Sequence, residues 1–154
     1  MTAPVARPWR AGDKTSCLAL FDSNLPRFFA PDERAEFETF LDALTLRPAP
    51  YLVLERGGRI VACGGLEVEP GGRQASLTWG MVNRALHGQR LGTALTTARL
   101  DLARAMPRLE RLVLATSQHV GGFYQGLGFE TEKITPGGFG PGLDRWDMAL
   151  DLRA

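Results

Sequence analysis

Histidine and cysteine are scarce in this chain of 154 residues, which contains two of each. Cys17 and Cys63 lie far apart in the sequence without the spacing of metal ligands, and His87 and His119 are equally isolated. These counts argue against a structural zinc site and against a disulfide scaffold. We therefore expect no metal, and two buried, reduced thiols in a reducing compartment.

The chain also lacks an excess of charge and long apolar runs. Its formal net charge is +1, so no overall basic field favours nucleic acid or an anionic membrane. No apolar run approaches the roughly 18 residues of a membrane span. The first ten residues lack the apolar core of a signal peptide. We expect a cytoplasmic protein that binds neither nucleic acid nor membranes.

What the chain has is the composition of a globular domain, with 44% hydrophobic and 23% charged residues. Its length predicts a single domain over residues 1–154. Hydrophobic periodicity predicts an α/β fold in which about four helices flank a mixed sheet of six to seven strands. The expected strands are 5–9, 51–56, 59–68, 74–83, 111–115, 129–135 and 145–152, and the expected helices begin near Asp13, Pro31, Ala85 and Val120.

Several local signals sharpen this prediction. Gly57-Gly58 is typical of a two-residue hairpin turn. In the helix expected over 85–105, the apolar stripe leaves Arg99 outside it, and Pro107 ends the helix. Residues 136–142 are predicted to form a glycine-rich loop.

The most informative segment is 79–93, where a strand, a short loop and a helix with two early glycines follow one another. The first turn of a helix has unpaired N–H groups and a partial positive charge, and glycines let an anion approach the backbone. The segment is therefore a candidate phosphate site. Gly88 could instead simply ease a tight turn. Neither a P-loop nor a dinucleotide fingerprint is present.

Two motifs resemble those of the GNAT superfamily of acyl-CoA-dependent N-acetyltransferases. Residues 87–92 are similar to its pyrophosphate motif, Arg/Gln-x-x-Gly-x-Gly/Ala, with Arg90 where a glycine is usual. Residues 116–129 resemble a second motif, with Phe123-Tyr124 in a short helix. The resemblance implies a GNAT-like fold and transfer of an acetyl group from acetyl-CoA to a primary amine by direct attack.

The resemblance also implies which residues contact the coenzyme. In that family the strand before the loop ends in a bulge, and the pantetheine arm pairs with its backbone. The implied coenzyme residues are Met81, Val82, His87, Gly88, Gln89, Arg90, Leu91, Gly92, Thr93 and Ser117.

Tyr124 stands at the position of the family's general acid. A phenol with a reference pKa of about 10 can protonate a departing thiolate whose conjugate acid has a pKa near ~8.5. On local pattern alone, Tyr124 could merely pack against Phe123 and Leu127.

The sequence gives weaker signals for the general base and for the acceptor site than for the coenzyme site. Glu67 is the leading base, although it could be a solvated carboxylate at a strand end; His119 and ordered water are alternatives. The acceptor site is expected to involve Asn24 and Phe28 near the second helix and Asp144 near the late loop. The acceptor is a small-molecule or protein amine, and a homodimer is left open. A non-catalytic acyl-CoA-binding module on the same fold is the alternative function.

Overall fold

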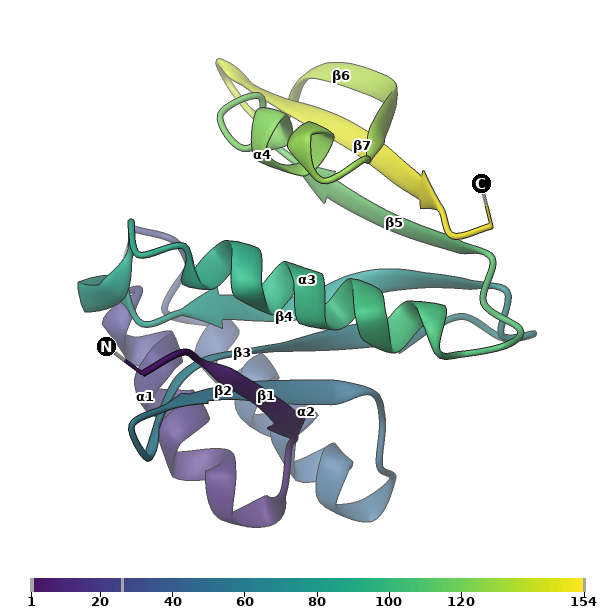
Figure 1. The fold of residues 1–154 in the computed structure, drawn as a ribbon. Coiled ribbons are helices and arrows are strands. Elements are labelled where there is room, and N and C mark those ends of the chain that lie inside the picture. Colours follow the sequence, from purple (N-terminus) through teal and green to yellow (C-terminus); the bar gives the residue numbers. More distant parts are fainter. Residues whose placement is uncertain (1, 26, 154) are drawn as a thin grey trace. The chain divides into compact units, whose positions relative to one another are not determined.

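The computed structural model describes residues 2–25 and 27–153. It contains a seven-stranded mixed sheet with strand order β1-β2-β3-β4-β5-β7-β6 and four α-helices (Figure 1). Helices and strands follow one another in the order that the sequence predicts. No helix within the described residues is long and apolar enough to cross a membrane. The elements are β1 (Val5–Pro8), α1 (Lys14–Ser23), α2 (Glu33–Leu46), β2 (Tyr51–Arg56), β3 (Arg59–Val68), β4 (Gln74–Val82), α3 (Leu91–Arg104), β5 (Arg111–Thr116), α4 (Gly121–Gly126), β6 (Glu130–Gly140) and β7 (Leu143–Asp151).

The chain forms two compact units. The first comprises the described residues up to Glu67 together with Thr78–Leu102, and the second comprises Val68–Leu77 and the described residues from Ala103 onward. β4 therefore begins in the second unit and ends in the first.

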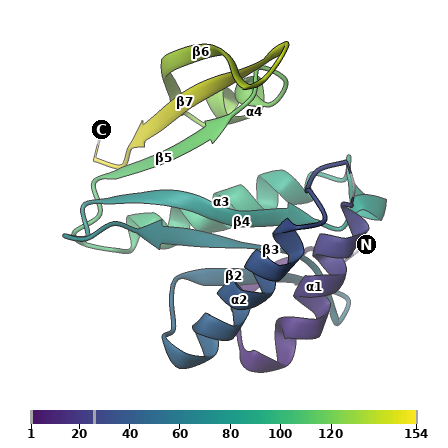
Figure 2. The same ribbon diagram turned by 180° about the vertical axis from the view of Figure 1, so that it is seen from behind.

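In the first unit, helices cover both faces of the strands (Figure 2). α1 and α2 pack on one face, where Phe21, Phe37, Leu41 and Val53 belong to one buried cluster. α3 packs on the other face through Leu91 and Leu95, which cluster with Leu54, Val61 and Ala62. This division follows from period-two alternation along the strands and from the apolar stripe of each helix.

The predicted hairpin between β2 and β3 is confirmed. Arg56 pairs with Arg59, and both Gly57 and Gly58 have positive φ, at 59° and 79°. That combination is the type I′ geometry that two successive glycines favour.

In the second unit, β5 pairs in parallel with the start of β4, over Gln74–Ser76 and Arg111–Val113. It pairs antiparallel with β7 on its other side, and β7 pairs with β6. Helix α4 packs beside β6. A Cβ on Gly121 would lie 2.2 Å from the Trp146 ring, so only glycine lets α4 begin so close to β7.

Two predicted boundaries were wrong. The helix expected from Ala85 begins at Leu91, because Arg84–Leu86 forms a separate 3-10 turn and the intervening loop contains left-handed residues. The loop expected over 136–142 is mostly strand, since β6 continues to Gly140. Its ladder with β7 is irregular between Thr135 and Gly140, and glycines with positive φ accommodate the shift.

Both cysteines are free thiols, as predicted, and both are fully buried. Although they are distant in sequence, Cys17 and Cys63 belong to the same buried cluster, which also contains Tyr51. Burial raises the pKa of Cys63 well above its usual value, so this thiol stays protonated and unreactive.

A charged cluster holds β1, α1 and β2 together. Arg7 Nη1 and Nη2 each donate to a carboxylate oxygen of Asp13 at 2.8 Å, and Nη2 also donates to Glu55 Oε1 at 2.8 Å. Asp13 precedes α1 at the expected N-cap position, yet its carboxylate accepts from the Arg10 N–H instead of capping the helix. The Arg7 guanidinium lowers the pKa of Asp13 below its usual value.

We expect Asp13→Asn to lower the free energy of unfolding by about 2 kcal/mol at neutral pH, because a nearly buried ion pair loses one partner. A depressed carboxyl pKa stabilises the fold above the unfolded value of about 3.9 and ceases to do so as pH falls through the folded pKa. The difference between variant and wild type in urea unfolding should therefore shrink below about pH 4. Glu38→Gln, which breaks an exposed pair with Lys14, is the control and should change little. A pH-independent difference would contradict the assignment.

Candidate functional site

The loop between β4 and α3 has an unusual backbone. Gly88 has a φ of 85° and Arg90 a φ of 63°, both in the left-handed region. The carbonyl oxygen of Arg90 accepts the Ala94 N–H, so the helix starts immediately after this residue. The first N–H groups of α3 have no partners within the helix and point toward the loop. Gly88, Gln89, Arg90 and Thr93 are exposed there.

The end of α1 is tied to the end of β4. Asn24 Nδ2 donates to the Val82 carbonyl at 3.0 Å and to the Leu20 carbonyl at 2.8 Å. The Arg84 N–H donates to Ser23 Oγ at 3.2 Å. His87 Nε2 lies 3.0 Å from the same Val82 oxygen, and it acts as the donor because a carbonyl can only accept.

This tie brings residues predicted for the acceptor next to residues predicted for the coenzyme. Asn24 is only 2% exposed, and its amide nitrogen is used by two carbonyls. Phe28, by contrast, is 51% exposed, and its ring meets His87 edge-on with centroids 5.3 Å apart. The guanidinium carbons of Arg27 and Arg84 lie 5.4 Å and 5.9 Å from the centre of that ring. An exposed aromatic side chain with cations around it therefore borders the loop.

β4 contains one strained residue. Trp79 has a φ of 40°, which is rare for a residue with a large side chain and is typical of a bulged strand. Tyr51 Oη donates to the Trp79 carbonyl at 2.8 Å, and the indole packs among Phe21, Phe29 and Phe37. The distortion lies just before Met81 and Val82, where the resemblance implied the bulged strand end. Met81 itself is buried under α1 and α2.

Arg99 was missed by the sequence analysis, which left it outside the apolar stripe of α3. It is only 4% exposed. Its guanidinium lies against Gly64 of β3 and Gly80 of β4. The only signal in the sequence is a glycine on each of two neighbouring strands, and that signal becomes meaningful once the two strands are paired.

The second unit positions Tyr124 and its surroundings. Tyr124 is half-buried on α4, with edge-on ring contacts to Phe123 at 5.1 Å and to Phe129 at 5.7 Å. Ser117 begins the turn into α4: its carbonyl accepts the N–H groups of Val120 and Gly121.

Gln118, which sequence reasoning also missed, joins this turn to the connection between β6 and β7. Its Nε2 donates to the Gly142 carbonyl at 2.9 Å, and its Oε1 accepts the Asp144 N–H at 2.8 Å. The predicted acceptor residue Asp144 accepts the Gly137 N–H at 3.0 Å through its carboxylate. An amide side chain between two backbone groups has no sequence pattern that would reveal it.

The candidate bases remain predictions. Glu67 is exposed near the end of β3, and His119 is exposed before α4. Glu67 and the loop of residues 87–93 belong to the first unit, whereas Ser117, His119, Tyr124 and Asp144 belong to the second. Among the described residues, no group of three or more His, Cys, Asp or Glu side chains could hold a metal ion.

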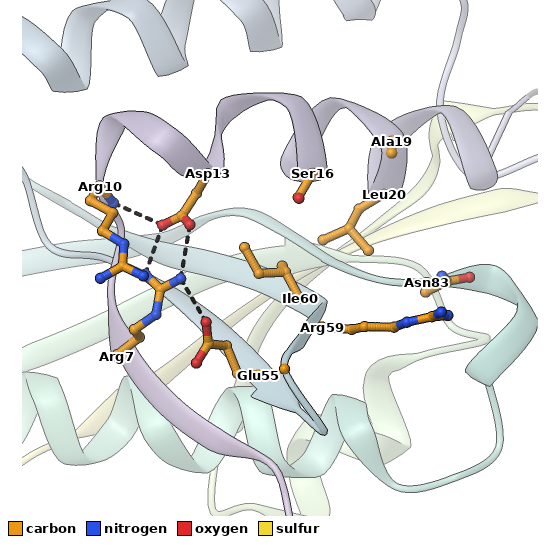
Figure 3. A pocket seen from close by; sticks show the side chains of 11 residues that line it. Arg7, Arg10, Asp13, Ser16, Ala19, Leu20, Glu55, Arg59, Ile60 and Asn83 are labelled. Carbon is orange, nitrogen blue, oxygen red and sulfur yellow. Dashed lines mark hydrogen bonds and ion pairs between the residues drawn. The ribbon is translucent and has the colours of Figure 1, made fainter.

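A cavity of about 450 Å³ lies beside the Arg7–Asp13–Glu55 cluster in the first unit (Figure 3). It extends along α1 and the β2–β3 turn to Asn83, and Arg10 and Arg59 line it. The residues predicted for the coenzyme and the acceptor are not among the described residues that line this cavity. The Arg7 guanidinium beside it is paired with two carboxylates.

Comparison with known proteins identifies the family. The sequence pattern of the Acetyltransferase (GNAT) family matches residues 17–129, well over half of the chain, and the chain belongs to this family. No curated protein matched in the corresponding search.

Solved structures show the same fold. One from Desulfovibrio desulfuricans, assigned to the GNAT acetyltransferases, superposes with a TM-score of 0.83 at 19% identity over 97% of this chain and 99% of that chain. YncA from Salmonella typhimurium, solved with its cofactor acetyl-CoA, gives 0.77 at 20% identity over 98% and 95%. The ribosomal-protein-S18-alanine N-acetyltransferase from Escherichia coli gives 0.76 at 18% identity over 97% and 94%.

The left-handed conformation of the loop can be tested by substituting alanine at Gly88 and, as a control, at Gly92. A methyl group added at Gly88 or at Gly92 would meet no atom within 4 Å, but only Gly88 has positive φ. We expect Gly88→Ala to lower the free energy of unfolding by about 1 kcal/mol through backbone strain. Gly92→Ala, in the first turn of α3, should raise it by about 0.5 kcal/mol. Equal effects in urea unfolding would contradict the loop conformation.

Proposed function

We propose that this protein is an N-acetyltransferase that transfers the acetyl group of acetyl-CoA to a primary amine. The observation that carries the proposal is the β4–loop–α3 element, in which two left-handed residues precede a helix start in a chain of the GNAT family. Structural neighbours solved with acetyl-CoA and coenzyme A support the choice of co-substrate.

The loop is suited to the pyrophosphate of the coenzyme. Successive backbone N–H groups in a loop with left-handed residues can converge on one anion, and the start of α3 adds the positive end of its dipole. Arg90, Gln89 and Thr93 add exposed polar groups around the same point. Arg90 occupies the left-handed position in which the family usually has glycine, so the loop keeps its backbone shape and gains a cation.

Acyl transfer then needs three events. The amine nitrogen attacks the thioester carbon, and the π electrons of the carbonyl move to its oxygen. The tetrahedral intermediate collapses, the C–S bond breaks and coenzyme A leaves as a thiolate. Tyr124 donates a proton to the sulfur. The acceptor nitrogen loses two protons: the ammonium gives one to Glu67, to His119 or to water before the attack, and the attached nitrogen gives the second afterwards, which restores the Tyr124 phenol through water. Phe123 and Phe129 hold the Tyr124 ring in place for this transfer.

The proposed acceptor is a primary amine, held by residues that include Phe28. Neighbours with this fold are named for quite different acceptors: spermidine, aminoglycosides and the alanine of a ribosomal protein. Asn24 is proposed to position the end of β4 for this reaction, and its two hydrogen bonds to the carbonyls of Leu20 and Val82 support that role. The carboxylate of Asp144 accepts the Gly137 N–H and so fixes the connection between β6 and β7. We propose that this connection forms one wall of the acceptor site.

Calorimetric titration tests the coenzyme site. We expect acetyl-CoA and coenzyme A to bind and ATP, which lacks a pantetheine arm, not to bind. Gly92→Glu should weaken coenzyme binding about tenfold or more by setting a negative charge against the pyrophosphate. Gly92→Gln is the neutral control of the same shape and should bind far better than the Glu variant. If wild-type protein freed of carried-over ligand binds neither coenzyme form, the proposal fails.

Tyr124→Phe tests the general acid. The variant keeps the ring packing, so we expect coenzyme affinity within about threefold of wild type and a kcat lower by about 10²- to 10⁴-fold, the effect of losing a general acid. The measurement is thiol release across a panel of amines. An unchanged kcat would remove Tyr124 from the mechanism. Tight coenzyme binding by the wild type with no transfer to any amine would instead favour a non-catalytic acyl-CoA-binding module.

A further inference from the structure

Arg99 is a buried cation in the middle of α3. Only 4% of it is exposed, whereas the arginines around the coenzyme loop, Arg84 and Arg90, are on the surface. Charged guanidinium groups are seldom buried, so the position of Arg99 is a distinctive feature of the first unit.

Two glycines create the space that Arg99 occupies. A Cβ on Gly80 would lie 2.9 Å from both terminal nitrogens of the guanidinium. One on Gly64 would lie 3.0 Å from the Gly80 Cα and 3.3 Å from Nη1. Neither glycine has positive φ, so the backbone conformation does not require glycine at these positions. What requires it is room: both strands lack a side chain where the guanidinium rests.

The cation therefore lies at the distorted part of β4. Gly80 directly follows Trp79, whose left-handed backbone is held from the α1 and α2 face by the Tyr51 hydroxyl. Arg99 comes from α3, on the opposite face (Figures 1 and 2). Burial raises the pKa values of Tyr51 and Cys63, and the Arg99 charge opposes that rise from the other face. The Trp79–Gly80 step thus lies between a hydrogen-bond donor and a fixed positive charge.

We propose that Arg99 supplies positive potential at the Trp79–Gly80 step that stabilises the negative charge developing on the thioester oxygen during acyl transfer. This inference rests on the proposed function, because it needs the acyl end of the coenzyme to lie along this part of β4. A preorganised charge in a water-poor site stabilises an oxyanion at no cost of reorganisation. Arg99 is not proposed to touch the reacting atoms. It acts on them through the electric field of its charge at the strand.

A purely structural role makes a different prediction. If Arg99 only filled the space beside the two glycines, an apolar side chain of similar length would serve as well, and a shorter cation would not. If its charge matters, Arg99→Lys should retain most of the polarisation of the thioester carbonyl, and Arg99→Met should lose it. The two variants therefore separate charge from packing.

The decisive measurement is the carbonyl stretching frequency of acetyl-CoA carrying ¹³C at the thioester carbon, bound to folded protein and recorded by difference infrared spectroscopy. Positive potential at the oxygen polarises the C=O bond and lowers its frequency. We expect a lowered frequency in wild type and Arg99→Lys, and a frequency closer to that of free acetyl-CoA in Arg99→Met. In parallel, kcat should fall about 100-fold in Arg99→Met, with coenzyme affinity within about threefold of wild type.

The outcomes separate this inference from the proposed function. Failure of wild type to bind acetyl-CoA overturns both. Binding with the same carbonyl frequency in wild type and Arg99→Met overturns the role of Arg99 alone, as does an Arg99→Lys variant no better than Arg99→Met. Should Arg99→Met not fold, Gly80→Ala provides the second test. This variant keeps the charge, but its methyl group displaces the guanidinium from the Trp79–Gly80 step, and an unchanged carbonyl frequency there would equally contradict the proposal.

Discussion

The left-handed backbone of Trp79 within β4 is the constraint on which the candidate site depends. A large residue at a φ of 40° persists only when its surroundings hold it there. Here the indole is packed among phenylalanines and its carbonyl is bound by the buried hydroxyl of Tyr51. Burial raises the pKa of Tyr51 well above its usual value, so the hydroxyl stays a donor across the physiological range. The strand distortion is therefore a fixed feature of the first unit.

The carbonyl of Val82 has a comparable role at the end of the same strand. It accepts from Asn24 at the end of α1 and from His87 in the loop before α3, so one oxygen fixes both the end of that helix and the loop that we propose for the coenzyme. The ring of Phe28 also contacts the His87 ring, so an exposed side chain beyond α1 borders the same loop. In this fold, the sequence distance between 24 and 87 is bridged by two hydrogen bonds to a single atom.

The sequence predicted what depends on local pattern. Periodicity indicated the order of helices and strands, and Gly57-Gly58 indicated the hairpin, because each is decided by neighbouring residues. The start of α3 was predicted six residues too early, since the 3-10 turn at Arg84 is held by Ser23, a residue far away in the chain. Arg99 was missed for the same reason: its burial depends on Gly64 and Gly80, which become neighbours only in the folded sheet. The bulged strand end was expected from family resemblance and not from any property of Trp79 itself.

Arg90 shows how a departure from a family motif can preserve the feature that the motif encodes. Glycine is usual at this position because the backbone is left-handed, and the φ of 63° at Arg90 keeps that backbone. An arginine in this conformation is strained by about 1 kcal/mol relative to a right-handed one. Its exposed guanidinium beside the start of α3 adds a charge that attracts the same anion as the helix dipole. The substitution is therefore consistent with the pyrophosphate loop that we propose.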